Sequence, residues 1–269
     1  RCIDAEEIEK FITKKTKIIT VVHQWGHPAD MDRIMEIAKK NDLLVLEDCS
    51  HAHGSKYKDK MCGTFGDIAI FSLQAQKMIF AGEGGVLVTN NKKYHDRATL
   101  LGHYRDRSKE EIKDIEYNKY WQTGFGLKLR MSPFNAVVAK YSLLNYEKHK
   151  ENRHKCLNYL NKRLEEIDYI ENIYNSDHID RGAWYGFKPL YIKEKLDNLD
   201  RKKLIEALRA EGMYIGTPSG TVLATQPLYK DFPDLMFGKR NKKKINKLDD
   251  FPNAVDVQEN ALSLPTFSD

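Results

Sequence analysis

Residues 43–91, "LLVLEDCSHAHGSKYKDKMCGTFGDIAIFSLQAQKMIFAGEGGVLVTNN", contain three short apolar runs separated by turns rich in Gly, Asp and Asn. The runs cover residues 43–47, 67–72 and 84–89, and each is typical of a buried strand. A fourth run precedes them at residues 17–22, and the spacing of apolar residues predicts helices over 4–14 and 31–41. This alternation of apolar strands and helices predicts an α/β fold, with a mostly parallel sheet covered on both faces.

The rest of the chain has a different pattern. Residues 130–167 form a long helical region, for which Ser132 and Pro133 provide a start signal. Strand-like segments at 184–192 and 213–217 then flank a helix over 200–212 that ends in glycine. We therefore expect three parts: residues 1–130 in a large domain, residues 131–182 as a connecting helical region, and residues 183–269 as a smaller C-terminal α+β domain.

Composition narrows the class of protein. The chain has 269 residues, of which 41% are hydrophobic and 31% charged, as in ordinary globular proteins. It contains no apolar run near the roughly 20 residues of a membrane helix, and its first ten residues contain no h-region of the kind found in signal peptides. The absence of an initiator Met predicts a piece of a longer protein, and the composition predicts a cytoplasmic location. Four scattered cysteines (Cys2, Cys49, Cys62 and Cys156) are typical of reduced thiols.

A net charge of +5 is modest for this length. Its densest block, "KRNKKK" at residues 239–244, lies in a polar stretch and is interpreted as a solvated loop. A nucleic-acid surface would be expected to interleave basic residues with aromatic ones. The sequence therefore predicts neither a nucleic-acid partner nor a membrane partner.

Chemically useful side chains follow the predicted strands. In open α/β sheets, ligands bind beyond the carboxyl ends of the strands. Here those ends carry His23, Asp48 and Ser72, and Lys77 comes five residues after Ser72. An acid, a hydroxyl and a lysine should therefore meet at one edge of the sheet.

A half-buried lysine opposite an aspartate suits pyridoxal phosphate (PLP) chemistry. The amine of Lys77 would bond to the aldehyde of the cofactor, and the carboxylate of Asp48 would keep the pyridine nitrogen protonated. An apolar environment lowers the pKa of a lysine and frees its amine for attack. The hydroxyl of Ser72 could donate to the phosphate, and the glycines of residues 82–85 would allow a tight turn.

Other interpretations of these residues remain open at this point. Lys77 could be a loop lysine that extends its ammonium group into solvent, and Asp48 could serve only as a turn or cap residue. His23 is more typical of a turn than of a substrate contact, and Trp184 and Tyr185 are more typical of packing than of a stacking platform. Metal ligands are also available, but the spacing matches no zinc motif, so no metal is predicted. These candidate ligands are Cys49, His51, His53 and Cys62.

Residues 43–91 resemble the core of the DegT/DnrJ/EryC1/StrS family of sugar aminotransferases. The matching blocks are E-D-x-x-x-A-x-G from Glu47, G-T-F-G-D from Gly63, F-S-x-x-x-x-K ending at Lys77, and G-E-G-G from Gly82. The resemblance continues through "VVHQWGHPADMD", "RMSPFNAVVA", "TQPLYKDFP" and "ALSLPTF", and so spans essentially the whole chain. It implies PLP fold type I, a three-layer α/β/α large domain lacking its N-terminal part, and a homodimer with shared active sites.

The resemblance also implies a role for each matching residue. Lys77 would be the catalytic lysine that bonds to the cofactor and carries the proton between the two half-reactions. Asp48 would pair with the pyridine nitrogen, His51 would lie beside the phenolic oxygen, and Ser72 would bind the phosphate. In the family an asparagine reaches the phosphate in the partner subunit, and Lys128 replaces it here.

The expected reaction moves an amino group from glutamate or glutamine to a keto sugar, with pyridoxamine phosphate carrying it between the halves. The sugar is expected to be linked to a nucleotide. A keto-cyclitol is the alternative acceptor, because "SLQAQK" and "AGEGG" also resemble that subgroup. A PLP protein with a different reaction is a further alternative. Relatives that dehydrate sugars carry histidine at the lysine position, so Lys77 favours transamination.

Overall fold

The computed structural model describes residues 2–173, 177–229 and 247–267. These residues form two compact units. The first contains residues 2–156 and 177–185, and the second contains residues 157–173, 186–229 and 247–267. The domain boundaries expected after residues 130 and 182 stay predictions, and the basic block at 239–244 lies outside the described residues.

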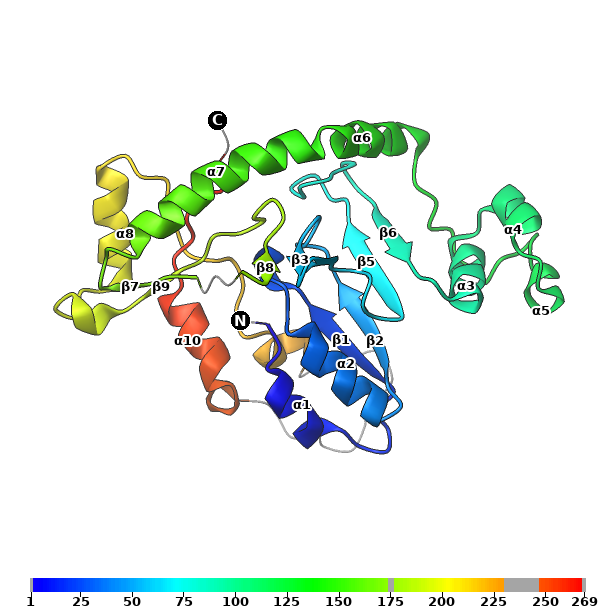
Figure 1. Ribbon diagram of the computed structural model, residues 1–269, viewed down its shortest axis with the longest axis horizontal. Coiled ribbons are helices and arrows are strands. Elements are labelled where there is room, and N and C mark those ends of the chain that lie inside the picture. The colour runs from blue at the N-terminus through cyan, green and yellow to red at the C-terminus, as the bar shows by residue number, and fades with distance from the viewer. Residues whose placement is uncertain (1, 174–176, 230–246, 268–269) are drawn as a thin grey trace. The chain divides into compact units, whose positions relative to one another are not determined.

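A four-stranded mixed sheet is the centre of the first unit (Figure 1). Its order is β1 (Ile18–Val22), β2 (Leu44–Asp48), β5 (Ile68–Ser72) and β6 (Gly85–Val88). The first three strands are parallel, and β6 runs antiparallel to β5. The predicted α/β fold with a mainly parallel sheet is therefore confirmed.

Helices α1 (Ala5–Phe11) and α2 (Met31–Lys40) pack on one face of β1 and β2 (Figure 1). Alternate strand residues point to this face, so Val21 and Val45 are buried in the core with Ile34 of α2. The side chain of Asp4 accepts a hydrogen bond from the N–H of Glu6, which confirms the predicted start of α1. Within the described residues, the alternate positions of β1 remain exposed on the other face.

The remaining elements of the first unit surround this sheet. A small antiparallel sheet has the order β4 (Lys60–Met61), β3 (Lys56–Tyr57) and β8 (Ile179–Asp180). The helical elements are η1 (Gln24–Gly26), α3 (Lys92–Gly102), α4 (Arg105–Glu111), α5 (Ile115–Asn118), α6 (Pro133–Leu144) and the start of α7 (Tyr146–Leu164). The helical region predicted over residues 130–167 is thus two helices that meet at Asn145.

The second unit contains short elements. A two-stranded sheet pairs β7 (Ile170–Glu171) with β9 (Leu190–Tyr191), and the helices are α8 (Arg201–Ala210) and α10 (Pro252–Asn260). Three short 3-10 turns, η2 (Lys193–Lys195), η3 (Leu223–Thr225) and η4 (Leu248–Asp250), connect them.

The strand-like segments expected in this region are mostly not strands. The segment at 184–192 is a strand only at Leu190–Tyr191, because Trp184 has a left-handed backbone (φ 52°) and Pro189 has no N–H to donate. Residues 213–217 form no strand, and Gly216 makes a single bridge to Ser263. No helix in the described part of the chain combines the length and apolar composition that crossing a bilayer requires.

Candidate active site

Glu47 and Asp48 end strand β2 and point to opposite faces of the sheet, as neighbouring strand residues must. Glu47 is buried on the core side, whereas Asp48 is half-buried on the other side. One oxygen of Asp48, Oδ1, accepts the backbone N–H of Ser50 at 2.9 Å. Its other oxygen has no hydrogen-bond partner among the described residues. Asp48 can therefore still accept a hydrogen bond from a ligand.

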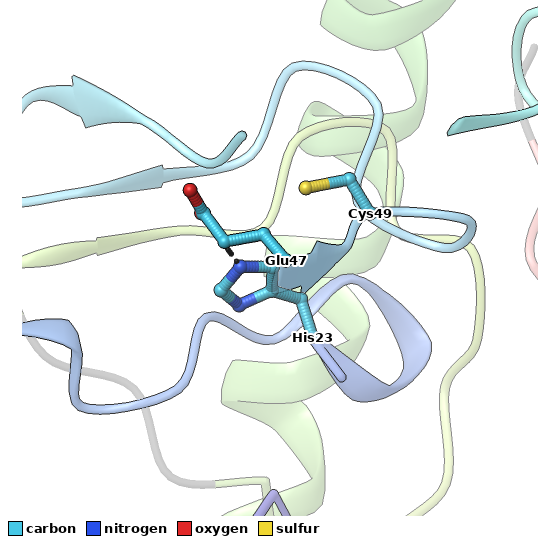
Figure 2. Close-up of side chains that lie close together, drawn as sticks. All are labelled: His23, Glu47 and Cys49. Atoms are coloured by element: carbon cyan, nitrogen blue, oxygen red, sulfur yellow. Dashed lines mark hydrogen bonds and ion pairs between the residues drawn. The ribbon is translucent and has the colours of Figure 1, made fainter. Parts of the chain in front are cut away.

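Glu47 is the acceptor of a buried hydrogen-bond network (Figure 2). Its carboxylate accepts the backbone N–H groups of Gly63, Phe65 and Gly66 at 2.7–2.8 Å, and His23 Nε2 at 3.1 Å. Burial raises the pKa of Glu47, but the hydrogen bonds from His23 and from the backbone outweigh it and lower the pKa overall. Glu47 thus fastens the 63–66 turn to β2 as a carboxylate.

His23, Glu47 and Cys49 offer three possible metal-ligand atoms within 4.8 Å of one another (Figure 2). The hydrogen bonds, however, use both nitrogens of His23. Nδ1 accepts the N–H of Ala29 at 3.1 Å, so Nε2 carries the hydrogen that it donates to Glu47. Burial raises the pKa of the Cys49 thiol, which disfavours the thiolate that a metal needs. We therefore interpret this cluster as structural.

His23 is fully buried, so it is a structural residue and does not face a substrate. Among the described residues, the possible metal-ligand atoms near Cys49 belong to His23 and Glu47. They do not belong to the candidates suggested by the sequence, His51, His53 and Cys62. None of the four cysteines, all of which lie in the described residues, forms a disulfide.

Lys77 lies in the loop between β5 and β6. The loop is closed by two backbone hydrogen bonds, from Leu73 N–H to Gly84 O at 2.9 Å and from Ala81 N–H to Leu73 O at 2.7 Å. Gly82 and Gly84 have φ angles of 83° and 146°, which residues with side chains rarely adopt. The predicted glycine turn after Lys77 is therefore confirmed.

Helix α6 makes hydrogen bonds to the loop between β5 and β6 (Figure 1). The buried hydroxyl of Ser142 accepts the N–H of Phe80 at 3.1 Å. The amide of Asn135 donates to the carbonyl oxygen of Glu83 at 2.9 Å. These contacts fix both ends of the turn that follows Lys77.

The amine of Lys77 contacts Tyr185. Lys77 Nζ lies 3.5 Å from the phenol oxygen and 4.5 Å from the centroid of the ring. The ring of His51 stacks on the ring of Tyr185, with centroids 4.0 Å apart and planes 14° apart. The Nδ1 atom of His51 accepts the backbone N–H of Trp25 at 3.3 Å, so its Nε2 carries the hydrogen when the ring is neutral.

The surroundings keep His51 neutral near pH 7. Burial and the nearby charge of Lys77 lower the pKa of His51 to about 4, although Asp48 acts in the opposite direction. Burial likewise lowers the pKa of His53 to about 4, against a raising effect of the Ser72 backbone. Asp48 and Lys77 thus both lie close enough to His51 to act on it electrostatically.

The residues singled out from the sequence are mostly found at one edge of the sheet. Ser72 ends β5, and Asp48 pairs with Ile70 two residues before it, so Ser72 and Asp48 share a face. Lys128 is exposed in the irregular stretch before α6 and makes no hydrogen bond or ion pair with the described residues. The role of Lys128 stays a prediction, as do the roles of Asp48, His51, Ser72 and Lys77.

Of the two aromatic residues interpreted as packing residues, one differs from that interpretation. Trp184 is buried (2% exposed) and packs as expected. Tyr185, by contrast, reaches Lys77 and His51 and was missed as a site residue. No local signal marks it, because it follows Lys77 by 108 residues and is brought there by packing alone.

Residues 1–269 match the DegT/DnrJ/EryC1/StrS aminotransferase family. The chain is 43% identical over 136 residues, 51% of its length, to the GDP-perosamine synthase of Escherichia coli O157:H7, of which the match covers 35%. It is 28% identical over 271 residues, 97% of its length, to the L-glutamine:scyllo-inosose aminotransferase of Streptomyces griseus, of which the match covers 63%.

The fold also matches solved structures. The aminotransferase from Psychrobacter cryohalolentis superimposes with a TM-score of 0.79 at 24% identity, over 98% of this chain and 67% of that one. The chain spans less than two thirds of the length of either curated relative. The family match over every residue nevertheless allows one assignment: this chain belongs to the DegT/DnrJ/EryC1/StrS aminotransferase family.

Proposed function

We propose that the protein is a PLP-dependent aminotransferase that moves an amino group from glutamate or glutamine to a nucleotide-linked keto sugar. One observation carries the proposal. At a single edge of the sheet, the structure combines the amine of Lys77, the half-buried carboxylate of Asp48 and the neutral imidazole of His51. Few cofactors other than PLP require an amine, a fixed negative charge and a neutral donor together.

The donor set fits PLP group by group. Lys77 would bond to the aldehyde carbon, and the unpaired oxygen of Asp48 would accept the hydrogen of the pyridine nitrogen. The Nε2–H of His51 would donate to the phenolic oxygen, since Nδ1 is already occupied. Ser72 would donate its hydroxyl to the phosphate, and Lys128 would meet a phosphate in the partner subunit as a point charge. When bound, the cofactor supplies a ring that accepts electrons from the carbon losing its proton.

The protein's own groups would then have separate tasks. The amine of Lys77 holds and moves the proton at the reacting carbon, as a general base and then a general acid. The carboxylate of Asp48 provides the fixed charge, and His51 remains an uncharged donor because its pKa is about 4. The Ser142 and Asn135 contacts keep the Lys77 loop in place during this exchange.

The relatives support the acceptor class. The matched protein of Escherichia coli O157:H7 is named for the synthesis of an amino sugar linked to GDP. The relative of Streptomyces griseus is named for amino transfer from glutamine to scyllo-inosose, so a keto-cyclitol is the second candidate acceptor. We rank the nucleotide-linked sugar first because the 136 residues matched to the first relative are 43% identical, whereas the longer match to the second is 28% identical.

We also propose that the protein is a cytoplasmic homodimer. Helix α6 exposes an apolar stripe at helical spacing (Phe134, Val137, Tyr141 and Leu144), whose members are 67–83% exposed. Exposed apolar surface of this kind supports an interface. Four cysteines that form no disulfide within the described residues support a reducing compartment.

The experiment is an amino-transfer assay on the full-length natural chain supplied with PLP. Glutamate or glutamine is offered with a GDP-linked 4-keto sugar or with scyllo-inosose, and the aminated product is measured by mass spectrometry. We expect turnover with the sugar, none with Lys77→Ala, and unchanged turnover with the exposed control Lys15→Ala. Product from scyllo-inosose alone would select the cyclitol candidate, and turnover by Lys77→Ala would contradict the proposal.

A further inference from the structure

Tyr185 is the only residue with a described hydrogen bond to the side chain of Lys77, within the residues that the structure covers. The phenol oxygen lies 3.5 Å from Nζ, and the ring face lies 4.5 Å from it. A cation near the face of an aromatic ring is attracted by the ring quadrupole. Tyr185 therefore offers Lys77 two contacts, a hydrogen-bond acceptor and a π face.

The place of Tyr185 is set by packing and does not depend on Lys77. The preceding residue, Trp184, is buried in a left-handed conformation (φ 52°), with the guanidinium of Arg181 4.3 Å from its ring. Gly182, also left-handed (φ 57°), passes so close to the carbonyl of His53 that a side chain would not fit. The imidazole of His154 contacts the carbonyl oxygen of Gly182. A strained and tightly held segment thus presents Tyr185 to the site.

The opposite side of Tyr185 is also fixed. His51 stacks on its ring and is tied through Nδ1 to the N–H of Trp25, another left-handed residue (φ 55°). Trp25, His51, Tyr185 and Lys77 therefore form a continuous chain of contacts. Tyr185 is its central member, because it contacts the imidazole and the amine at once.

We propose that Tyr185 is a positioning residue for this reaction: it receives the amine of Lys77 whenever that amine is free, and keeps it beside His51 at the edge of the sheet. The inference rests on the proposed function. Without Tyr185, the four-carbon chain of Lys77 would sample other rotamers, and fewer of them would hold the amine where a proton must be moved. Tyr185 does not itself exchange a proton with the substrate.

The test compares Tyr185→Phe, which keeps the ring, with Tyr185→Leu, which removes it. The matched control is Tyr159→Phe, at a position that is 69% exposed. The first measurement is the rate at which acetic anhydride acetylates Lys77 in the protein without cofactor, resolved by mass spectrometry against exposed Lys15. Loss of both contacts should free the amine, so Tyr185→Leu should raise the Lys77 rate about two- to fivefold, with Tyr185→Phe intermediate.

The second measurement separates positioning from folding. In the full-length enzyme supplied with PLP, Tyr185→Phe should lower kcat about three- to tenfold and leave KM for the amino donor within about twofold. Its thermal midpoint should equal that of the control. If Lys77 acetylation and kcat in Tyr185→Phe both match the wild type, the inference is wrong. If the wild type itself shows no amino transfer, the proposed function fails, while the acetylation result still decides whether Tyr185 holds Lys77.

Discussion

Glu47 and Asp48 are neighbours in the sequence, and the structure gives them different tasks. Glu47 accepts three backbone N–H groups and one imidazole N–H in the core. Glu47→Gln replaces one acceptor oxygen by an NH₂ group that faces donors, so we expect the free energy of unfolding to fall by about 2–4 kcal/mol. Denaturant titration measures it, with the exposed residue Glu151→Gln as control. An unchanged unfolding free energy in Glu47→Gln would show that the network does not hold the turn.

His53 predicts a dependence of stability on pH. It is buried, and its pKa of about 4 lies below the ordinary value of 6.5. Between these values the unfolded chain binds a proton that the folded chain excludes, so this contribution to stability is complete above pH 6.5 and declines as the pH falls from 6.5 to about 4. The loss from this residue is at most about 3 kcal/mol.

His53→Gln should therefore flatten the dependence of the unfolding free energy on pH between 6.5 and 4. The matched control is His178→Gln, at an exposed position, which should leave the slope unchanged. The His53→Gln variant should still lose some stability in acid, because the pKa of His51 is also about 4. We expect this remaining loss to be smaller, because His51 is less buried than His53. If the unfolding free energy of His53→Gln depends on pH as steeply as that of the wild type, the lowered pKa of His53 is not the cause of the acid sensitivity.

At the residue scale, the sequence predicts those candidate site residues that lie close together in the chain. Asp48, His51, Ser72 and Lys77 come within 30 residues of one another, and strand periodicity alone places the acid and the hydroxyl at one edge. Tyr185 could not be found this way, because its contact with Lys77 depends on the packing of Trp184 and Gly182. The role of Glu47 was equally hidden, since its partners are backbone groups of a turn.

At the scale of elements, the loop that carries Lys77 depends on helix α6. Ser142→Ala removes the acceptor for the N–H of Phe80, so we expect a loss of about 1–2 kcal/mol and faster hydrogen exchange at that amide. Ser132→Ala is the matched control on the same helix, because the Ser132 side chain makes no cap hydrogen bond. Equal exchange rates at Phe80 in both variants would show that α6 does not restrain the loop.

Helices and strands were predictable where one period dominates. Strands β1, β2 and β5 and helices α1, α2 and α8 follow their apolar pattern closely. The segment at 184–192 was not predictable in the same way, because its apolar residues serve packing. Its Trp184 takes a left-handed turn, which no alternation of apolar and polar residues reveals.

At the scale of the whole molecule, the proposed dimer predicts that α6 mediates association. Val137→Glu places a charge in the apolar stripe. It should raise the dissociation constant (Kd) of the dimer about tenfold or more, so that more of the protein is monomeric. Ala136→Glu, next to it on the helix and outside the stripe, should leave the dimer intact. Sedimentation velocity over a dilution series measures both. A dimer unaffected by Val137→Glu would move the interface elsewhere.

The central claim is that the amine of Lys77 bonds covalently to PLP across from Asp48. The most direct measurement is to mix the full-length chain with PLP, reduce it with borohydride, and identify the modified residue by peptide mass spectrometry. We predict one stable cofactor adduct, on Lys77. The amount of this adduct should be much smaller in Asp48→Ala and unchanged in Asp59→Ala. Modification spread over several lysines, or an adduct that is unchanged when Lys77 is replaced by Ala, would contradict the claim.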